Sequence, residues 1–574
     1  MKRKCKRLCA ITSLVFLVVN MAACGGGGGK NTETAEKEAV SKEAGSLSEP
    51  GTYPILAQPV EMTMFLTSSP LIEDFATNDF SVYMENMTGI KWDFQVAPQD
   101  SLEEKMNLAL QSGDYPDVFW KCSPAPDFAR YGTKEGIIIP LDDLINEENM
   151  PNYMHLVSKY PQYLDMTREA DGKIYSLCSV NECFHCMYAR KLWMNTELLD
   201  KIGAGIPKTT QDFYDVCKKY LQYDPEGIAL TGCDDTGWHS SVYKWIMGSF
   251  LLVSDGKVDE VLSPEGKVVS AATDDRYKEA LKYLNSLYEL GAIDESAFSQ
   301  GAEEMKSLVN RDPASVLFFP QGASVNVIDP ITNKELFEKY DVLEPLQGPD
   351  GTSITPCFKY SGGQSGAFCI TDKCKNPEAA LRWADWFYGL SENDSLNLPG
   401  IMSCFGFNEG EYELKPEGWL GLNGKPAVVR VAQDFVWSSD PQNHDWQDNV
   451  LTANLAECRN SEAMFKEEDY EGLKPHDNSE KLLYDETENK QVPHAQDPAK
   501  DGDILPELKL TAEESSQIGT MVVEVQKLIE ENAAMFITGQ KDIETEWENY
   551  KKDLDNAGLQ TILEVYNTAY QRQK

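Results

Sequence analysis

The hydrophobic pattern changes period repeatedly between residues 60 and 120. Continuous or alternating apolar runs, typical of strands, are separated by stretches in which apolar residues recur every three to four positions, as on one face of a helix. The predicted elements are strands at 62–66, 90–96 and 117–120 and helices at 80–87 and 102–110. This order of elements predicts a doubly wound α/β unit with parallel strands.

The residues that follow these strands are candidates for ligand contact, because ligands of such sheets bind beyond the carboxyl ends of the parallel strands. Trp120 has a second interpretation as an aromatic residue that caps the core, and the sequence leaves both open. The candidates placed by topology are Thr67, Ser68, Ser69, Trp120 and Lys121.

A second stretch with clear local signals lies between residues 187 and 220. A strand-like apolar run ends at Met194, and Asn195 supplies an N-cap for a short helix that stops at Gly203. Thr209 then caps a further helix. The apolar positions of that helix, at helical spacing, are Phe213, Val216, Cys217 and Tyr220.

Helices are also predicted for much of the remaining chain. Residues 274–290 and 376–389 show helical spacing, and the second of these begins with an Asn-Pro pair typical of a helix start. Thr511 and Glu514 form a capping box ahead of a helical C-terminal tail. The predicted extended segments are 316–319 and 361–370.

Aromatic residues beside polar groups give a second set of candidates. A ring face can stack on the C–H face of a sugar, while carboxylates and hydroxyls bond the sugar hydroxyls. Trp238 follows two aspartates, and the Gly, Asn and Asp-rich region 400–446 adds further rings, although each ring could instead belong to a core. The candidates are Asp234, Asp235, Trp238, Tyr243, Phe407, Trp437 and Trp446.

Charge and motifs narrow the function. A formal net charge of −41 disfavours nucleic acid, whose phosphates need clustered Lys and Arg, and makes anionic ligands less suitable. The sequence has no G-x-S-x-G, H-E-x-x-H or Walker loop. A glycoside hydrolase that uses two carboxylates stays open, although no pair stands out among the acidic residues.

The 14 cysteines have no regular spacing. The densest group contains Cys178, Cys183, His185 and Cys186, and Cys183 with Cys186 forms a C-x-x-C. This group lacks the second spaced pair of a zinc site and the following helix of a redox motif. We therefore expect structural or disulfide roles, and we predict no metal and no cofactor.

The N-terminus predicts export. A basic start precedes the apolar run 8–19, which is too short to span a bilayer and is typical of a secretory signal peptide, assigned to residues 1–23. Met21–Cys24 resembles a bacterial lipobox, which implies lipidation at Cys24. Residues 24–57 have few large apolar side chains and predict a flexible linker.

Several segments, in matching order, resemble bacterial extracellular solute-binding proteins (family 1), in particular the carbohydrate-binding lipoproteins that serve ABC importers. The chain departs from this family at Cys178, where a proline is usual. The segments are 112–120 (SGDYPDVFW), 136–145, 171–177 (DGKIYSL), 187–220, 361–389, 536–540 and 547–572.

The resemblance implies an α/β, two-lobed periplasmic-binding-protein-like fold (type II), hinge-linked, with a helical C-terminal tail. The length after the linker also favours two lobes, because it exceeds what one core supports. The expected division assigns 58–178 with 356–400 to lobe 1 and 179–355 with 401–574 to lobe 2.

The function implied by the resemblance is capture of a carbohydrate, expected to be an oligosaccharide, in an interlobe cleft. The ligand would pass unaltered to the permease subunits of an ABC transporter. We expect a monomer on the outer face of the cytoplasmic membrane of a Gram-positive cell, held by its lipid anchor. The alternatives are a receptor for peptides or another solute and, in a different class, a secreted glycoside hydrolase.

Overall fold

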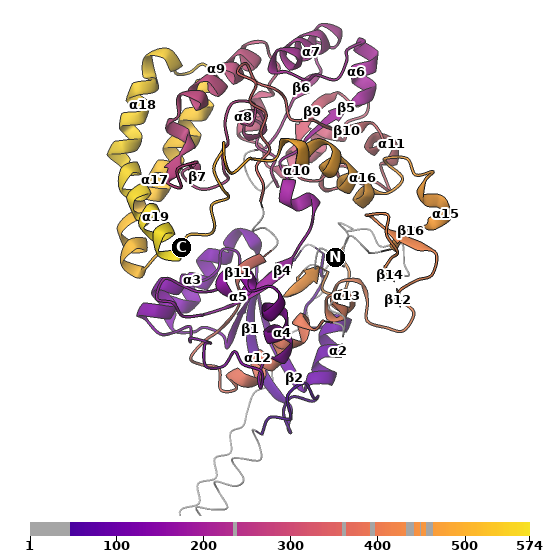
Figure 1. Ribbon diagram of the computed structural model, residues 1–574, viewed down its shortest axis with the longest axis vertical. Helices are drawn as coiled ribbons and strands as arrows, with labels where there is room; N and C mark the ends of the chain where they lie inside the picture. Colours follow the sequence, from indigo (N-terminus) through magenta and orange to yellow (C-terminus); the bar gives the residue numbers. More distant parts are fainter. Residues whose placement is uncertain are drawn as a thin grey trace, which may run out of the picture. The chain divides into compact units, whose positions relative to one another are not determined.

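Two β-sheets organise the chain. The computed structural model describes residues 46–69, 71–233, 238–358, 363–390, 397–431, 441–447, 449–454 and 463–574. Within this part, the first sheet has the strand order β15-β4-β11-β3-β1-β2 and the second has the order β10-β5-β9-β6. Figure 1 shows the first sheet in its lower half and the second in its upper half.

The first sheet confirms the predicted parallel unit. β1 pairs in parallel with β2 and β3, β15 pairs in parallel with β4, and β11 runs antiparallel between β3 and β4. The carboxyl ends of all the strands except β11 therefore lie at one edge. The strands are β1 (Val60–Thr67), β2 (Ile90–Ala97), β3 (Val118–Trp120), β4 (Leu177–Asn181), β11 (Gly363–Ile370) and β15 (Thr452–Asn454).

Local signals set the helices around this sheet. The Asn78 side chain accepts the Phe80 N–H at 3.0 Å and so caps α2. Gly89 and Gly113 end α2 and α3 with φ values of 73° and 78°, in the left-handed region that favours glycine. The helices are α2 (Asp79–Thr88), α3 (Leu102–Ser112), α4 (Pro151–Lys159), α5 (Gln162–Asp165), α12 (Pro377–Asp385) and α13 (Leu398–Phe405).

The second sheet follows directly from the stretch that begins at residue 187. The Asn195 side chain accepts the Leu198 N–H and caps α6, and Thr209 forms a capping box with Asp212 at the start of α7. Both predicted caps are confirmed. The strands are β5 (Leu192–Asn195), β6 (Ile228–Leu230), β9 (Val316–Pro320) and β10 (Tyr340–Leu343). The helices are α6 (Thr196–Ile202), α7 (Thr210–Tyr223), α8 (Lys244–Met247), α9 (Asp275–Glu289), α10 (Ala302–Val309) and α11 (Lys334–Phe337).

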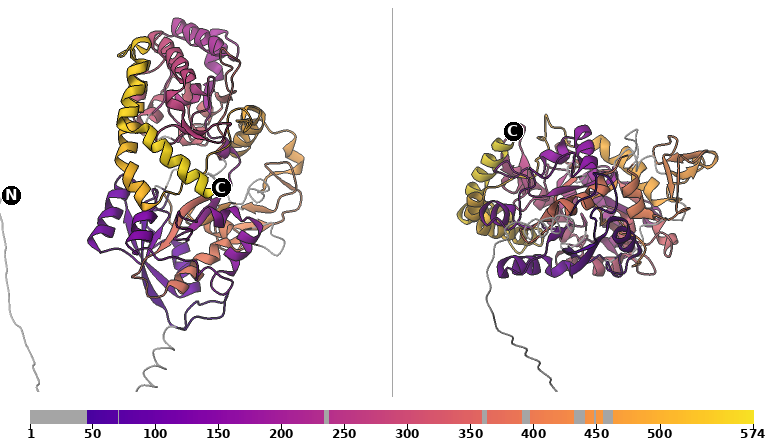
Figure 2. Two further views of the ribbon diagram at one scale, coloured as in Figure 1. Left: turned by 60° about the vertical axis from the view of Figure 1, so that its left-hand side comes forward. Right: turned by 90° about the horizontal axis from the view of Figure 1, so that it is seen from below.

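The chain ends in three helices that pack on the second half of the structure, as Figure 2 shows in yellow. They are α17 (Ala512–Ile537), α18 (Ile543–Ala557) and α19 (Leu559–Gln573). The predicted capping box of Thr511 and Glu514 starts α17. Ile518, Phe536 and Trp547 join the apolar core that also contains residues of β5 and β9, so the helical tail is part of the second core.

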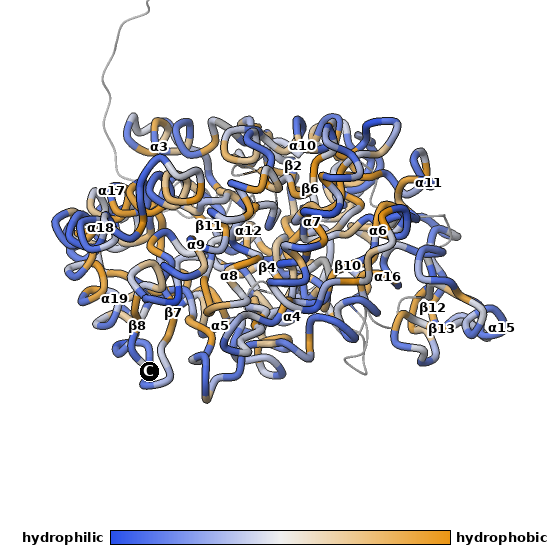
Figure 3. The backbone as a smooth tube through the Cα atoms, turned by 90° about the horizontal axis from the view of Figure 1, so that it is seen from above, coloured by the Kyte–Doolittle hydropathy of each residue, from blue (hydrophilic) through white to orange (hydrophobic). Residues whose placement is uncertain are grey.

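Short two-stranded sheets and helices complete the described part. Hydrophilic segments such as α15 lie at the periphery in Figure 3, whereas hydrophobic segments gather inside. The two-stranded sheets are β7 (Glu260–Leu262) with β8 (Val268–Ser270), β12 (Tyr412–Leu414) with β14 (Val429–Val431), and β13 (Trp419–Gly421) with β16 (Ala463–Lys466). The helices are α15 (Glu467–Tyr470) and α16 (Ser479–Glu486).

The core of the first sheet extends further along the chain than the expected boundary at residue 400. Ile401, Trp446 and Leu451 are buried in the same apolar cluster as Met64 and Leu66 of β1. β15 also adds to this sheet beside β4. The packing thus corrects the expected assignment of 401–574 to lobe 2, because residues up to β15 contribute to the first core.

Among the described helices, none combines the length and apolar character required to cross a membrane.

We expect Trp446→Ala to destabilise the protein by about 3–5 kcal/mol, because the fully buried ring leaves a large cavity. Its indole N–H also donates to Ser81 Oγ at 2.9 Å and would leave that hydroxyl without this bond. Urea unfolding followed by circular dichroism measures the loss. Trp419→Ala, at a half-buried position, is the control, and an equal loss in both variants would contradict the assignment of Trp446 to the core.

Candidate functional site

The candidate site begins at the edge of the first sheet, where its parallel strands end. Thr67, Ser68 and Ser69 follow the main part of β1, and Lys121 follows β3. The Ser68 N–H donates to Ala97 O of β2 at 2.8 Å. The Lys121 N–H donates to Ala367 O of the antiparallel strand β11 at 2.7 Å. The structure thus brings these four residues to one edge, as topology predicted. Their contact with a ligand stays a prediction.

Two of the segments that connect the halves begin or end at this same edge; a third passage follows β15, because α16 packs on the second half. The first crossing, residues 182–191, runs from β4 through the turn His185–Tyr188 to β5. The second crossing, residues 355–362, returns from the second half to β11, and its described part ends at Phe358. The Phe358 N–H donates to Met187 O at 2.7 Å, so the two crossings are joined by a backbone hydrogen bond.

A buried lysine fixes the first crossing. Lys191 Nζ donates to the carbonyl oxygens of His185 at 2.9 Å and Tyr188 at 2.6 Å. Burial lowers the pKa of Lys191 to about 7, against the opposing effect of the Glu486 carboxylate. The side chain therefore holds the turn through hydrogen bonds that both its charged and its neutral form can donate.

Trp238 lies where loops from the second sheet meet the crossings. Its carbonyl accepts the Gly322 N–H at 2.9 Å, and a Cβ on Gly322 would come within 2.4 Å of its ring, so glycine is needed for this approach. The ring of His185 lies 6.4 Å from the Trp238 ring, centre to centre. Trp238 is half-buried and packs against the apolar cluster that contains Trp193 and Phe319.

Two further pairs of rings near the crossings were not among the predicted site residues. The rings of His239 and Phe358 lie 4.6 Å apart, and those of Phe184 and Tyr484 lie 5.0 Å apart. These residues come from separate parts of the chain. Their local sequences carry no shared pattern, and the only available signal was that Phe184 and Phe358 flank the segments where the chain changes sheet.

An ion-pair cluster lies beside the rings of His239 and Phe358. The buried guanidinium of Arg190 contacts Asp255 at 2.7 Å, and His239 Nδ1 lies 3.1 Å from the same carboxylate. Burial alone would raise the pKa of Asp255, but the Arg190 charge and the His239 hydrogen bond hold it below its usual range. Burial also lowers the pKa of His239, which favours its neutral form.

Four predicted ligand residues lie elsewhere. Trp120 is fully buried, and its ring centre lies 5.4 Å from that of Trp383 and 5.5 Å from that of Trp446. Trp120 and Trp446 are therefore core residues, which corrects the prediction that they face a ligand. Tyr243 is likewise buried in the second core. Phe407 packs half-buried against Tyr83, with 4.9 Å between ring centres.

Three further candidates, Asp234, Asp235 and Trp437, lie outside the described residues, as do Cys24 and the segment assigned to the signal peptide.

A cavity of about 1030 Å³, lined by both apolar and polar side chains, opens beside the same sheet edge. Its floor contains Lys509, whose Nζ donates to Ser365 Oγ of β11 at 3.0 Å and lies 3.2 Å from Glu169. Burial raises the pKa of Glu169, while the Lys509 charge opposes this effect. The cavity is lined by the segments 124–129, 162–172, 363–365, 506–510 and 572–573, in part. Its amides, hydroxyls and balanced charges suit a polar guest.

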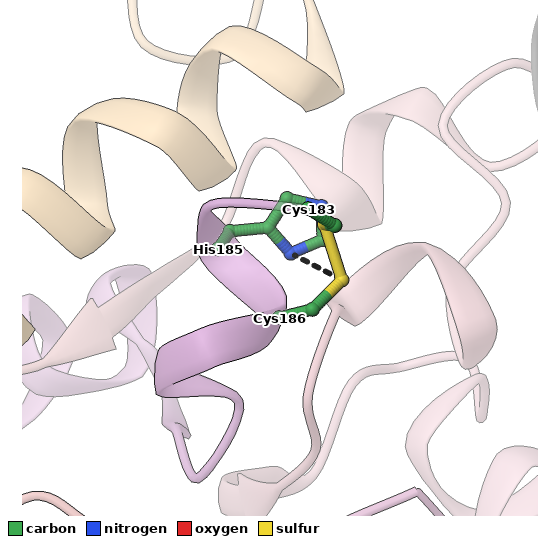
Figure 4. A group of neighbouring side chains, drawn as sticks. All are labelled: Cys183, His185 and Cys186. Atoms are coloured by element: carbon green, nitrogen blue, oxygen red, sulfur yellow. Dashed lines mark hydrogen bonds between the residues drawn. A yellow bond between two sulfur atoms is a disulfide. The ribbon is translucent and has the colours of Figure 1, made fainter. Parts of the chain in front are cut away.

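The C-x-x-C of the first crossing is closed. Cys183 and Cys186 form a disulfide, which is one of the roles that the sequence led us to expect. Figure 4 shows the ring of His185 beside the sulfur of Cys186 on the same turn.

Two α/β halves, each with its own sheet and core, two crossings at the carboxyl edge of the first sheet and a helical tail define a two-lobed solute-binding protein. The chain belongs to the family of bacterial extracellular solute-binding proteins, whose model matches residues 67–391, more than half of the sequence.

Known proteins resemble the chain over its length. The "Fructooligosaccharide ABC transporter substrate-binding protein FusA" of Streptococcus pneumoniae serotype 4 is 26% identical over 98% of each chain. The "Polygalacturonan/rhamnogalacturonan-binding protein YtcQ" of Bacillus subtilis is 23% identical over 57% of this chain and 63% of its own. The solved structure of FusA in complex with kestose has a TM-score of 0.72 at 23% identity and covers 89% of this chain and 99% of FusA.

A solved FusA variant is described as an EF-hand mutant, so we compared the EF-hand spacing with this sequence. That spacing requires acidic or amide residues at positions 1, 3 and 5, Gly at 6 and Glu at 12. The segment that begins at Asp497 has Asp501 and Gly502 in place but Ala499 at position 3 and Leu508 at position 12. The residues do not fit, and we assign no role to calcium.

Lys191→Met should remove part of the pH dependence of stability. Because the pKa of Lys191 is about 7 in the folded chain and 10.5 ordinarily, the unfolded chain holds more protons between these values, and the free energy of unfolding rises with pH. The wild type should gain up to about 1.4 kcal/mol per pH unit from this group between pH 7.5 and 9.5, and the variant should not.

Urea unfolding at several pH values measures this difference. The control is Lys219→Met, which removes an exposed lysine whose Nζ donates to a backbone carbonyl, that of Gly203. If Lys191→Met and the wild type show parallel pH profiles, Lys191 does not carry the lowered pKa.

Proposed function

We propose that this protein is the substrate-binding component of an ABC importer and captures an uncharged oligosaccharide without altering it. The observation that carries this proposal is the similarity to FusA over 98% of both chains, together with the two-lobed fold. The printed names of FusA and YtcQ both specify carbohydrate ligands. Receptors of this family bind and release their solute, so no catalytic residue is assigned.

The chemistry around the crossings supports a sugar ligand. The Trp238 ring can stack on the C–H face of a sugar ring, with Phe358 beside His239 as a neighbouring aromatic surface. The hydroxyl groups of Ser68 and Ser69 at the edge of the first sheet can bond sugar hydroxyls, whereas the hydroxyl oxygen of Thr67 is buried. A net charge of −41 favours a neutral guest over an anionic one.

Capture would proceed by closure of the two halves about the crossing segments. A ligand that contacts both halves favours the closed state by its differential affinity. We propose that the permease recognises this closed state and that the ligand then leaves. In this mechanism we use the two lobes predicted from the sequence, with one change: the residues from 401 to β15 belong to the lobe of the first sheet.

The proposed location is the outer face of the cytoplasmic membrane. Residues 1–23 would direct export, the lipidated thiol of Cys24 would anchor the chain, and the linker after it would give it reach. The expected end of this linker at residue 57 is corrected by the structure, because Ile55 and Leu56 are buried in the first core. The protein would act there as a monomer beside its permease.

Fructo-oligosaccharides are the first ligands to test. Kestose at 100 times its dissociation constant should stabilise the protein by about 2.7 kcal/mol, with a saturable rise in melting temperature. Glucose and a tripeptide serve as comparison ligands. Time-dependent release of reducing sugar would instead identify a hydrolase, and stabilisation by the peptide alone would identify a receptor for another solute.

Trp238→Ala should weaken binding of the stabilising sugar about tenfold, which corresponds to about 1.4 kcal/mol, because the stacking surface is lost. Isothermal titration calorimetry measures the affinity. Tyr223→Ala, an exposed aromatic residue at the end of α7, is the control and should bind normally. Equal affinities of all three proteins would remove Trp238 from the proposed site.

A further inference from the structure

The turn of the first crossing carries a set of side chains that the proposed function does not use. Cys183, His185 and Cys186 lie within four consecutive residues, and one potential ligand atom from each lies within 4.8 Å of the others. Two sulfurs and an imidazole nitrogen form a donor set that zinc prefers. In this structure the two sulfurs form a disulfide and are not available as ligands.

We propose that reduction of the Cys183–Cys186 disulfide converts this turn into a three-ligand site for zinc(II). Cys183 Sγ, Cys186 Sγ and His185 Nδ1 would bind the ion, and water would complete the tetrahedron. The site does not depend on the identity of the solute that the protein binds.

The distances suit this conversion. In a tetrahedral zinc site the sulfur and nitrogen ligands lie about 3.6 Å apart, as follows from bond lengths of about 2.3 and 2.0 Å. His185 Nδ1 already lies 3.9 Å from Cys186 Sγ. Two changes remain. The ligand atoms of Cys183 and His185, which lie within 4.8 Å of each other, must come to about 3.6 Å, and the two sulfurs must separate from their bonded distance to about 3.8 Å, which reduction permits.

A second observation concerns the other nitrogen of His185. His185 Nε2 faces Glu480 Oε2 of α16 at 3.6 Å, and both side chains are largely buried. In zinc sites the ligating histidine typically directs its second N–H to a carboxylate, which fixes the ring and makes the ligating nitrogen more basic. In the reduced, metal-bound turn Glu480 would act as a positioning residue, because its carboxylate stands where it could accept the Nε2–H of His185 while Nδ1 binds the metal.

The chemistry balances with a thiol reductant. A dithiol such as dithiothreitol attacks one sulfur, passes through a mixed disulfide and leaves as its own cyclic disulfide, and the two electrons and two protons appear on Cys183 and Cys186 as thiols. Zinc then displaces both thiol protons, and the neutral imidazole donates its lone pair. One zinc ion replaces two protons, so uptake should strengthen as pH rises.

The test compares zinc uptake by the full chain before and after reduction. The chain is reduced with dithiothreitol, freed of reductant under nitrogen, incubated with zinc sulfate, desalted and measured by mass spectrometry of the metal. We expect the reduced chain to retain one zinc ion more than the oxidised chain. With cobalt(II) in place of zinc, a thiolate-to-cobalt charge-transfer band should report sulfur ligation.

Variants assign the ligands. Cys183→Ser should abolish the gain, and His185→Gln, which keeps both sulfurs, should weaken it at least tenfold. Glu480→Gln should weaken affinity 10- to 100-fold while keeping the cobalt band. Cys374→Ser removes a half-buried cysteine outside the disulfide and should change nothing. Circular dichroism checks that each variant is folded.

Three results would overturn the proposal. The first is that two additional thiols are titrated after reduction but no additional zinc is retained. The second is that the disulfide resists reduction in the folded chain. The third is that His185→Gln and Cys183→Ser retain as much zinc as the wild type, which would place the metal on other cysteines.

Discussion

The buried side chain of Lys191 donates hydrogen bonds to two carbonyl groups of the first crossing. These bonds stabilise the turn where the chain passes from the first sheet to the second. A turn of four residues exposes carbonyl groups that a buried site must satisfy, because unpaired polar groups inside a protein are costly. Lys191, which directly precedes β5, donates hydrogen bonds to the carbonyl groups of His185 and Tyr188. β5 of the second sheet follows this turn directly, and the ring of His185 in the turn lies 6.4 Å from that of Trp238.

Sequence reasoning succeeded where structure is decided locally. The caps at Asn195, Thr209 and Thr511 depend on bonds that span three residues, and all three are present. The parallel unit followed from the alternation of periods. The hydrophobic pattern does not tell whether other side chains or a ligand cover an aromatic ring. The sequence therefore could not distinguish the core residues Trp120 and Trp446 from rings that face a ligand. β15 joins β4 from more than 270 residues away, and no local pattern carries that information.

In the candidate site, too, some residues could be placed from the sequence and others only from the structure. Thr67 to Ser69 and Lys121 were placed by a rule about parallel strands, which needs only the order of elements. The environment of Trp238 required coordinates, because Gly322, His185 and Phe358 come from three distant segments. The approach of Trp238 to Gly322 explains why glycine is needed there, since a Cβ would meet the indole at 2.4 Å. A single sequence presents that glycine as one turn residue among many.

The contacts of the crossings also determine which residues can move together. The first crossing is closed by the Cys183–Cys186 bond, held by Lys191 and tied by Arg190 to Val253 O at 2.8 Å. Phe358 of the second crossing is bonded to Met187 of the first. These ties connect the first crossing to the second half, which places the pivot of the proposed closure nearer to the end of β4. Trp238 and Phe358 would then move as one surface toward the hydroxyl groups at the edge of the first sheet, which is the geometry that capture of a polar guest requires.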